Sequence, residues 1–191
     1  MRVCFATNNA HKLEEVKTIL GKRFQILSLK EAGFVGDIPE THETLEENSL
    51  EKAQFIFDKL KIPVFSDDSG LEVKQLGGKP GVHSAHYAGT RDASVNINKI
   101  LEELGDSQMR EAQFRAVITF INEGGYRQFE GVVKGRLATA IQGEGGFGYD
   151  PIFIPEGHEK TFAELSPQIK NSVSHRKRSV EKLANYLKSI L

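Results

Sequence analysis

The segment from Phe114 to Val133 constrains the fold of this chain more than any other. Its first half places apolar side chains at every second position, at Phe114, Ala116, Ile118 and Phe120. Glycines at positions 124 and 125 then mark a turn, and a second run of β-forming residues follows. This pattern predicts an antiparallel β-hairpin. Because a hairpin cannot belong to an all-parallel sheet, we expect the sheet to be mixed.

The remaining segments alternate between strand patterns and helix patterns. Strands are expected at residues 3–7, 24–29, 64–73 and 152–154. Helices are expected where apolar residues recur with helical spacing, at residues 13–20, 44–60, 92–104 and 180–190. Glycine-rich loops are expected at residues 76–89 and 143–151. The whole pattern predicts an α/β fold in which helices flank a mixed β-sheet.

Charge and composition restrict the partners of the chain. Its 191 residues carry a formal net charge of −1, whereas general nucleic-acid binders have a strong basic excess. An anionic substrate would therefore need a few locally placed cations. No apolar run approaches the roughly 18 residues of a membrane span, and the N-terminal apolar segment is too short for a signal peptide. The single cysteine, Cys4, cannot form an internal disulfide. We expect a cytoplasmic protein with no nucleic-acid or membrane partner.

The turn between the first strand and the first helix is a candidate phosphate site. It consists of Thr7, Asn8, Asn9, Ala10, His11 and Lys12. The start of a helix presents unpaired N–H groups and a positive dipole end, and both attract anions. Helix capping alone would explain the asparagines. Capping would not explain Lys12, because a cation in the first turn opposes the helix dipole.

An acidic pair lies inside the strand expected at residues 64–73. Asp67 and Asp68 have hydrophobic neighbours on both sides, and buried carboxylates need a cation or several donors. In a strand they would point to opposite faces, so we expect different tasks for them. Gly70 would permit a turn that exposes the pair, and a solvated hairpin tip is the alternative interpretation. Glu40 is a natural partner, since two carboxylates with phosphate oxygens and water make a typical Mg²⁺ site.

Three further features could contact a nucleotide. Lys52 lies on the second helix, although most lysines are simply solvated. In the second glycine-rich loop, Phe147 and Tyr149 could stack on a base and Asp150 could accept a hydrogen bond, or the loop is only a turn with aromatic anchors. The dense basic run at residues 170–178 could donate to keto or phosphate oxygens, or it is a solvated face.

Taken in order, these motifs closely resemble those of the inosine-triphosphate pyrophosphatase family. The similarity spans essentially the whole chain, through TNNAHK, SDDSGLEV, GGKPGVHSAHYAG, GGFGYDPIF and KNSVSHR. The chain departs from the family pattern at Asn8, where glycine is frequent, and at His86, where arginine is frequent. The resemblance implies a single domain over residues 1–191 with an elongated mixed sheet and flanking helices. It also implies two lobes, an active site in the cleft between them, and a homodimer.

The resemblance further implies roles for individual residues. Glu40 and Asp68 match the magnesium-binding acids of the family, and Asp68 also matches the catalytic proton acceptor. The implied substrate contacts are Thr7, Asn8, Asn9, Ala10, His11, Lys12, Lys52, Ser69, Phe147, Gly148, Tyr149, Asp150, Lys170, His175 and Arg176. The first turn and Lys52 would hold the triphosphate, and the later residues would form the nucleotide pocket.

The implied reaction is magnesium-dependent hydrolysis of ITP, dITP and XTP to the nucleoside monophosphate and pyrophosphate. A 6-keto oxygen would accept hydrogen bonds from donors around His175 and Arg176, whereas the 6-amino group of ATP would oppose those donors. Two alternatives stay open. The same machinery would serve modified pyrimidine or other damaged nucleotides, or the chain binds nucleotides without catalysis. The non-catalytic alternative leaves the pairing of Glu40 with Asp68 unexplained.

Overall fold

The computed structural model describes residues 1–21 and 24–190 of the chain. Its residues separate into two compact units. Unit 1 comprises Met1–Asp68, Ala116–Gly131 and Arg176–Leu191, and unit 2 comprises Ser69–Arg115 and Val132–His175. The described strands form a six-stranded sheet in the order β2-β1-β3-β4-β5-β6. Because β1 pairs in parallel with β2 and β3 while β5 pairs antiparallel with β6, the predicted mixed sheet is confirmed.

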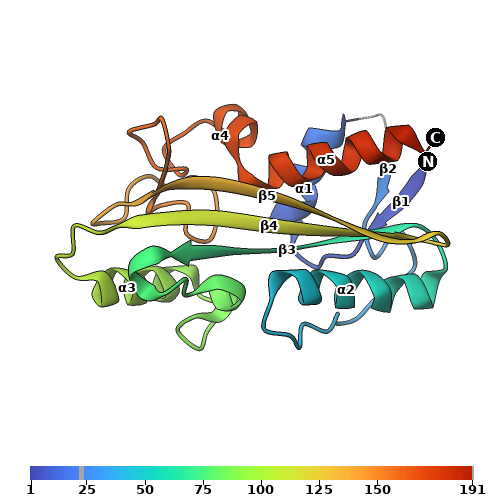
Figure 1. Cartoon of the computed structure of the whole chain (residues 1–191), viewed down its shortest axis with the longest axis horizontal. Helices are drawn as coiled ribbons and strands as arrows, with labels where there is room; N and C mark the ends of the chain where they lie inside the picture. The colour runs from blue at the N-terminus through green and yellow to red at the C-terminus, as the bar shows by residue number, and fades with distance from the viewer. Residues whose placement is uncertain (22–23, 191) are drawn as a thin grey trace. The chain divides into compact units, whose positions relative to one another are not determined.

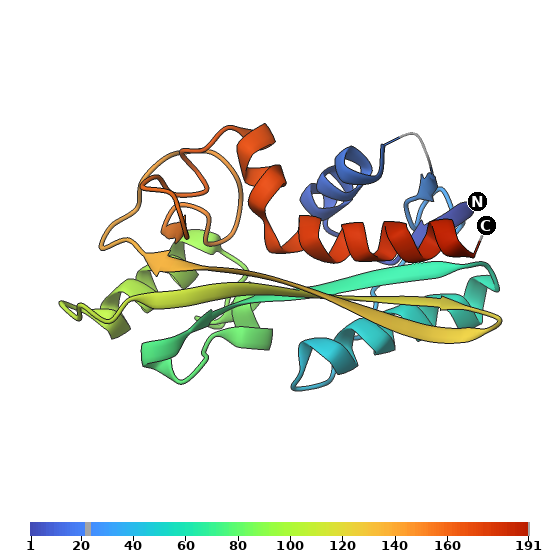
Figure 2. The ribbon, with the colours of Figure 1, turned by 45° about the horizontal axis from the view of Figure 1, so that its top comes forward.

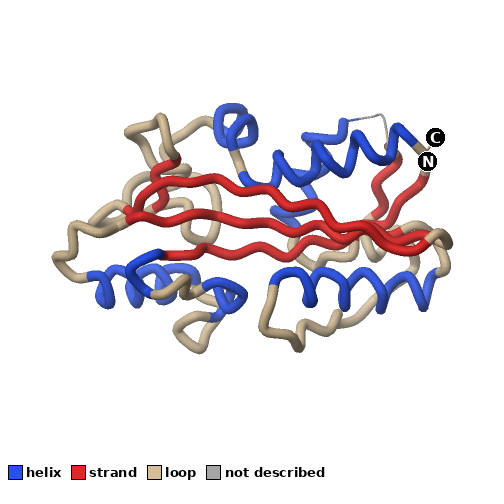
Figure 3. The backbone as a smooth tube through the Cα atoms, viewed as in Figure 1, coloured by secondary structure: helices blue, strands red, loops and turns tan. Residues whose placement is uncertain are grey.

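In unit 1, helices cover both faces of the strands (Figures 1 and 2). The elements are β1 (Arg2–Phe5), α1 (Ala10–Leu20), β2 (Gln25–Leu27), α2 (Leu45–Leu60) and α5 (His175–Ser189). Helices α1 and α5 lie on one side, and α2 lies on the other (Figure 3). Alternate side chains of β1 point to these two layers: Val3 and Phe5 share a core cluster with Val180, and Cys4 shares another with Ile56.

The ends of the unit 1 helices follow signals in the sequence. The side chain of Asn9 caps α1 by accepting a hydrogen bond from the backbone N–H of Lys12, and Gly21 follows the last turn with φ 59°. The hydroxyl of Thr44 caps α2 by accepting from the backbone N–H of Glu47 at 3.2 Å. This cap marks the start of α2, and the loop that carries the candidate acid Glu40 precedes it.

Strand β3 (Val64–Val73) runs unbroken through the acidic pair. The predicted interruption of this strand is wrong, and so is the alternative of a solvated hairpin tip, because Asp67 is 1% exposed and Asp68 is 8% exposed. Gly70 serves close packing rather than a turn. A Cβ atom at this position would lie 2.1 Å from the carbonyl oxygen of Gly81.

The predicted hairpin is formed by β4 (Glu111–Asn122) and β5 (Gly125–Leu137), which are neighbours in the sheet. Unit 2 also contains η2 (Lys74–Leu76), η3 (Gly81–His86), α3 (Ala93–Leu104), β6 (Phe153–Pro155) and α4 (Pro167–Val173). Its core joins Ile97 and Ile100 of α3 to Leu71 of β3 and Phe114 of β4.

Two parts of unit 2 differ from the expectation. The segment at residues 76–89 was expected to be a plain loop, but it contains η3, a short 3-10 helix that follows Pro80. The basic run begins within α4, a short helix that the periodicity did not predict. Ser174 ends α4 because its backbone is extended, with ψ 154°, and α5 begins at the next residue. Each helix among residues 1–21 and 24–190 is too short or too polar to span a membrane.

Candidate active site

The first turn of unit 1 is built by its own side chains. The backbone N–H of Asn9 donates to the hydroxyl of Thr7 at 3.1 Å, and the side chain of Asn8 donates to the carbonyl of Gly36 at 3.2 Å. Asn9 caps α1, so the capping interpretation is confirmed for this asparagine. The start of α1 is therefore preorganised, with Ala10 and His11 exposed beside it. Such a helix start suits an anionic group.

Lys12 is held toward the acidic pair. Its Nζ lies 3.0 Å from Oδ1 of Asp67, and the other oxygen of Asp67 accepts from Nε of Arg176 at 3.1 Å. Arg176 also pairs with Glu15 of α1. Burial alone would raise the pKa of Asp67, but the charges of Lys12, Arg176 and Lys52 outweigh it and hold that pKa well below its usual value. The carboxylate of Asp67 therefore favours its charged form and contacts two cations.

Asp68 meets a different cation. The Nζ of Lys52 lies 3.0 Å from Oδ1 of Asp68 and 2.5 Å from Oε1 of Glu40. Burial would lower the pKa of Lys52, but Asp68 and Glu40 raise it, so the ammonium group stays charged. Burial raises the pKa of Asp68, and the nearby Lys52 only partly opposes this effect. The alternative that Lys52 is a solvated surface lysine is wrong, because the side chain is buried.

The loop that carries Glu40 is tied to α2 by residues that were not predicted as site residues. The backbone N–H of His42 donates to the Asn48 side chain at 2.9 Å, and that side chain donates to the His42 carbonyl at 3.1 Å. Both the backbone N–H and the hydroxyl of Thr41 donate to the carboxylate of Glu51, each at 2.8 Å. These contacts fix Glu40 next to Lys52. Asn48 lies four residues before Lys52, at helical spacing, which is a faint signal for Asn48 in the sequence.

In unit 2, the second glycine-rich loop folds around Asp150. Its Oδ2 accepts from the backbone N–H of Phe147 and from Nζ of Lys170, each at 2.7 Å. The ammonium group of Lys170 also lies 4.6 Å from the centroid of the Phe147 ring. Gly146 allows this arrangement, because its φ is 74° and a Cβ there would lie 2.1 Å from Asp150 Oδ2. A half-buried aromatic face beside a buried ion pair can receive a planar ring.

Tyr149 and His175 take different positions in unit 2. The hydroxyl of Tyr149 donates to the carbonyl of Ser84 at 2.8 Å, so this buried side chain anchors the loop to η3. Burial, with the nearby Tyr87, holds the pKa of Tyr149 well above its usual value. The imidazole of His175 is buried and stacks on Phe114. Ser69 and Gly148 are half-buried.

The structure thus gathers the predicted residues into two groups. In unit 1 the first turn, Lys52 and the acids Glu40 and Asp68 come together, and Arg176 joins them through Asp67. In unit 2 the glycine-rich loop is joined by Lys170. The pairing of Arg176 with Asp67 joins positions 109 residues apart. The sequence indicated that Asp67 needs a cation, but it did not indicate that this cation is Arg176.

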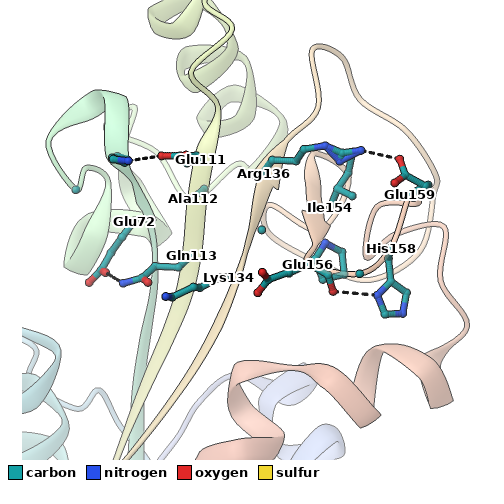
Figure 4. Close-up of a pocket in the computed structure, with 15 residues that line it drawn as sticks. Glu72, Glu111, Ala112, Gln113, Lys134, Arg136, Ile154, Glu156, His158 and Glu159 are labelled. Atoms are coloured by element: carbon teal, nitrogen blue, oxygen red, sulfur yellow. Dashed lines mark hydrogen bonds and ion pairs between the residues drawn. The ribbon is translucent and has the colours of Figure 1, made fainter.

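A separate cavity of unit 2 contains none of the predicted site residues. It has a volume of about 780 Å³ and lies over the polar face of β3, β4 and β5 (Figure 4). Several of its charges are already paired: Lys74 contacts Glu111, and Arg136 donates to Glu159 at 2.8 Å. Its walls therefore offer paired charges rather than the cluster of cations that a triphosphate needs.

The acids of unit 1 fit a divalent cation that also contacts its ligand. The buried Oδ2 of Asp68 makes no hydrogen bond within the described part of the chain, and Glu40 is partly exposed beside it. Among residues 1–21 and 24–190, no group of three or more metal-binding side chains comes together. Two carboxylates completed by phosphate oxygens and water are the usual donor set for Mg²⁺.

Together these features define a class: an α/β protein with a preorganised helix start, a carboxylate pair around a buried lysine, and an aromatic loop with a buried ion pair. Within that class, the chain belongs to the Ham1 family, whose sequence model matches residues 3–186. The inosine-triphosphate pyrophosphatase resemblance is thereby confirmed.

Curated relatives and solved structures agree with this family. The chain is 47% identical to the dITP/XTP pyrophosphatase of Porphyromonas gingivalis, with 97% of each chain covered. It is 43% identical to the protein of the same name from Bacillus subtilis, with 96% of each covered. The structure of the Staphylococcus aureus Ham1 protein superimposes with a TM-score of 0.91 at 37% identity over the full length of both chains. A HAM1 protein from Coxiella burnetii gives a TM-score of 0.90 at 37% identity, with 99% of each covered.

Proposed function

We propose that this chain hydrolyses deaminated purine nucleoside triphosphates, namely ITP, dITP and XTP, to the nucleoside monophosphate and pyrophosphate. The observation that carries the proposal is the buried ammonium group of Lys52, held between the carboxylates of Glu40 and Asp68. Full-length similarity to proteins named dITP/XTP pyrophosphatase supports the substrate class.

The triphosphate would be bound by the first turn and by two lysines. The start of α1 offers backbone N–H groups, and Lys12 offers a charge that Asp67 already orients. Lys52 is anchored between two acids, so binding would cost it little conformational entropy. Both lysines would neutralise charge on the departing pyrophosphate.

We further propose Mg²⁺ as the cation of this site, held by Glu40 and Asp68. When bound, the ion would neutralise charge on the phosphate oxygens of the substrate. Asp68 would contribute one oxygen to this site and would also accept the proton of the attacking water. Its buried position favours proton uptake, since burial disfavours the charged form of a carboxylate.

The reaction would be one hydrolytic displacement. The oxygen of water forms a bond with the α-phosphorus, and the bond from that phosphorus to the oxygen bridging the α- and β-phosphates breaks. The proton of the water passes to Asp68. General-base assistance of this kind contributes about 10²–10⁴ in rate.

The base would be recognised by residues of unit 2. The face of Phe147 would stack on the purine, next to the pair formed by Lys170 and Asp150. The imidazole N–H of His175 would donate a hydrogen bond to the 6-keto oxygen of a deaminated purine. The 6-amino group of ATP is itself a donor, so the buried N–H of His175 would have no acceptor, which costs about 1–3 kcal/mol.

We also propose that the protein is a homodimer and acts in the cytoplasm, where nucleotide pools are found.

Product analysis tests the proposal. The purified protein is incubated with ITP and Mg²⁺, and the products are resolved by ³¹P NMR and by ion-exchange chromatography. IMP with pyrophosphate in equal amounts is expected. IDP with orthophosphate would contradict attack at the α-phosphorus, and ITP binding without turnover would contradict catalysis. Equal kcat/KM values for ITP and ATP would contradict selection of the 6-keto group.

A further inference from the structure

The ring of His175 rests on a residue that no motif singles out. Phe114 of β4 stacks on the imidazole with ring centroids 4.8 Å apart and planes inclined by 11°. Both residues belong to unit 2, and both are buried, Phe114 at 8% and His175 at 6% exposure. The near-parallel contact fixes the plane of the imidazole relative to the sheet.

Phe114 is itself held from other directions. Its ring meets Phe153 edge-on, with centroids 4.7 Å apart and planes at 62°. It also stacks on Phe162, with centroids 6.2 Å apart and planes at 21°. A ring packed against three aromatic neighbours has little rotational freedom, so it provides His175 with a rigid platform.

The stack matters because the two ring nitrogens of a neutral imidazole differ. One ring nitrogen donates a hydrogen bond and the other accepts one. The Phe114 ring covers one face of the imidazole. Both nitrogens of His175 lie in the imidazole plane, which is nearly parallel to the Phe114 ring. If the ring tilted out of this plane, its N–H would no longer point at a 6-keto oxygen, and the hydrogen bond would weaken.

We propose that Phe114 is a positioning residue that sets the purine selectivity of the enzyme through His175. The inference rests on the proposed function, in which a donor at His175 serves the 6-keto oxygen. Phe114 itself need not touch the nucleotide. By keeping the imidazole in one plane, Phe114 keeps the N–H of His175 directed at the position of the purine.

The test compares two matched variants of one strand. F114L removes the planar platform but keeps an apolar side chain, and F120L makes the same change at a buried phenylalanine of β4 that lies in unit 1. The measured quantity is the ratio of kcat/KM for ITP to that for ATP. We expect F114L to lower this ratio about tenfold or more, and F120L to leave it within about twofold of the wild-type ratio.

A double-mutant cycle separates positioning from loss of structure. If Phe114 acts through His175, the F114L/H175A double variant should have the same ratio as H175A alone. A further, independent loss in the double variant would overturn the inference. An unchanged ratio in folded F114L, with a selective wild type, would also overturn it and would leave the proposed function intact.

The imidazole provides a readout that does not depend on turnover. The ring protons of His175 should be shifted upfield by the Phe114 ring in the wild-type NMR spectrum, and F114L should lose this shift while F120L keeps it. An unselective or inactive wild type would overturn the proposed function and the selectivity role with it. Absence of the upfield shift in the wild type would overturn the positioning role directly.

Discussion

Asp67 and Asp68 are neighbours in β3, yet their carboxylates meet different cations and have opposite pKa shifts. Asp67 pairs with Lys12 and Arg176, which outweigh the effect of burial and lower its pKa. Asp68 contacts Lys52, and burial raises its pKa. Consecutive positions in a strand point to opposite faces, and here α1 and α5 lie on one face and α2 on the other (Figure 1). One strand thus supplies two carboxylates whose pKa values are shifted in opposite directions.

Asp68→Asn should remove catalysis while ITP binding persists. The amide keeps the size of the carboxylate but cannot take up the proton of water, so kcat should fall about 10²–10⁴-fold. Pyrophosphate release measures kcat, and calorimetry with ITP and Ca²⁺ measures binding. Turnover near the wild-type rate would show that Asp68 is not the base.

Asp67→Asn should act mainly on stability. It would leave the buried guanidinium of Arg176 with one acid fewer, and removing one partner of a buried pair costs about 3–5 kcal/mol. Urea unfolding measures the change in the free energy of unfolding. Glu181→Gln is the control, because its exposed pair with Lys177 should contribute about 1 kcal/mol or less. Equal effects of the two substitutions would contradict the structural role of Asp67.

Glu40→Gln should weaken metal dependence more than nucleotide binding. The variant loses a charged oxygen donor beside Asp68, so the Mg²⁺ concentration for half-maximal ITP hydrolysis should rise about tenfold or more. EDTA should abolish the activity of the wild type. Asp37→Asn, an exposed acid of the same loop, should leave the Mg²⁺ dependence unchanged. A Mg²⁺ dependence that does not respond to Glu40→Gln would remove Glu40 from the metal site.

The elements of the fold could largely be predicted, because local patterns determine them. The alternation around Phe114 indicates the hairpin, and capping residues such as Thr44 mark where helices begin. The continuity of β3 through the acidic pair could not be predicted from local patterns. Asp67 and Asp68 are unfavourable in a buried strand without cations, and those cations come from other elements.

The same reasoning explains why sequence analysis, which named Lys52 as a substrate contact, predicted neither the burial of Lys52 nor the stacking of Phe114. Lys52 is buried against the general preference of lysine, because two acids distant in sequence compensate its charge. Phe114 is one of several apolar residues in an alternating run, and nothing in that run distinguishes the one that stacks on His175. Residues that bind a ligand leave motifs, whereas residues that position them depend on tertiary contacts.

Gly70→Ala should destabilise the protein through a steric clash. A Cβ atom there would lie 2.1 Å from the carbonyl oxygen of Gly81 and 3.0 Å from the hydroxyl of Ser84, so β3 or η3 must shift. We expect a loss of about 1–3 kcal/mol in the free energy of unfolding, with reduced activity because Ser69 adjoins the shift. Gly124→Ala is the control, since its nearest contact would be a side-chain oxygen at 3.2 Å. Equal melting temperatures for both variants would contradict the close packing.

Cys4 should make the protein less stable at alkaline pH. Burial raises the pKa of this thiol from 9.0 to about 11. Between these values the unfolded chain releases the thiol proton while the folded chain keeps it, so stability falls as the pH rises. At about 1.4 kcal/mol per pKa unit, the total loss is about 3 kcal/mol.

Urea unfolding of the wild type and of Cys4→Ala at pH 8, 9.5 and 11 isolates this effect. The difference between the two free energies should be constant below pH 9 and should then change in favour of the variant. A constant difference up to pH 11 would show that the thiol ionises equally in both states.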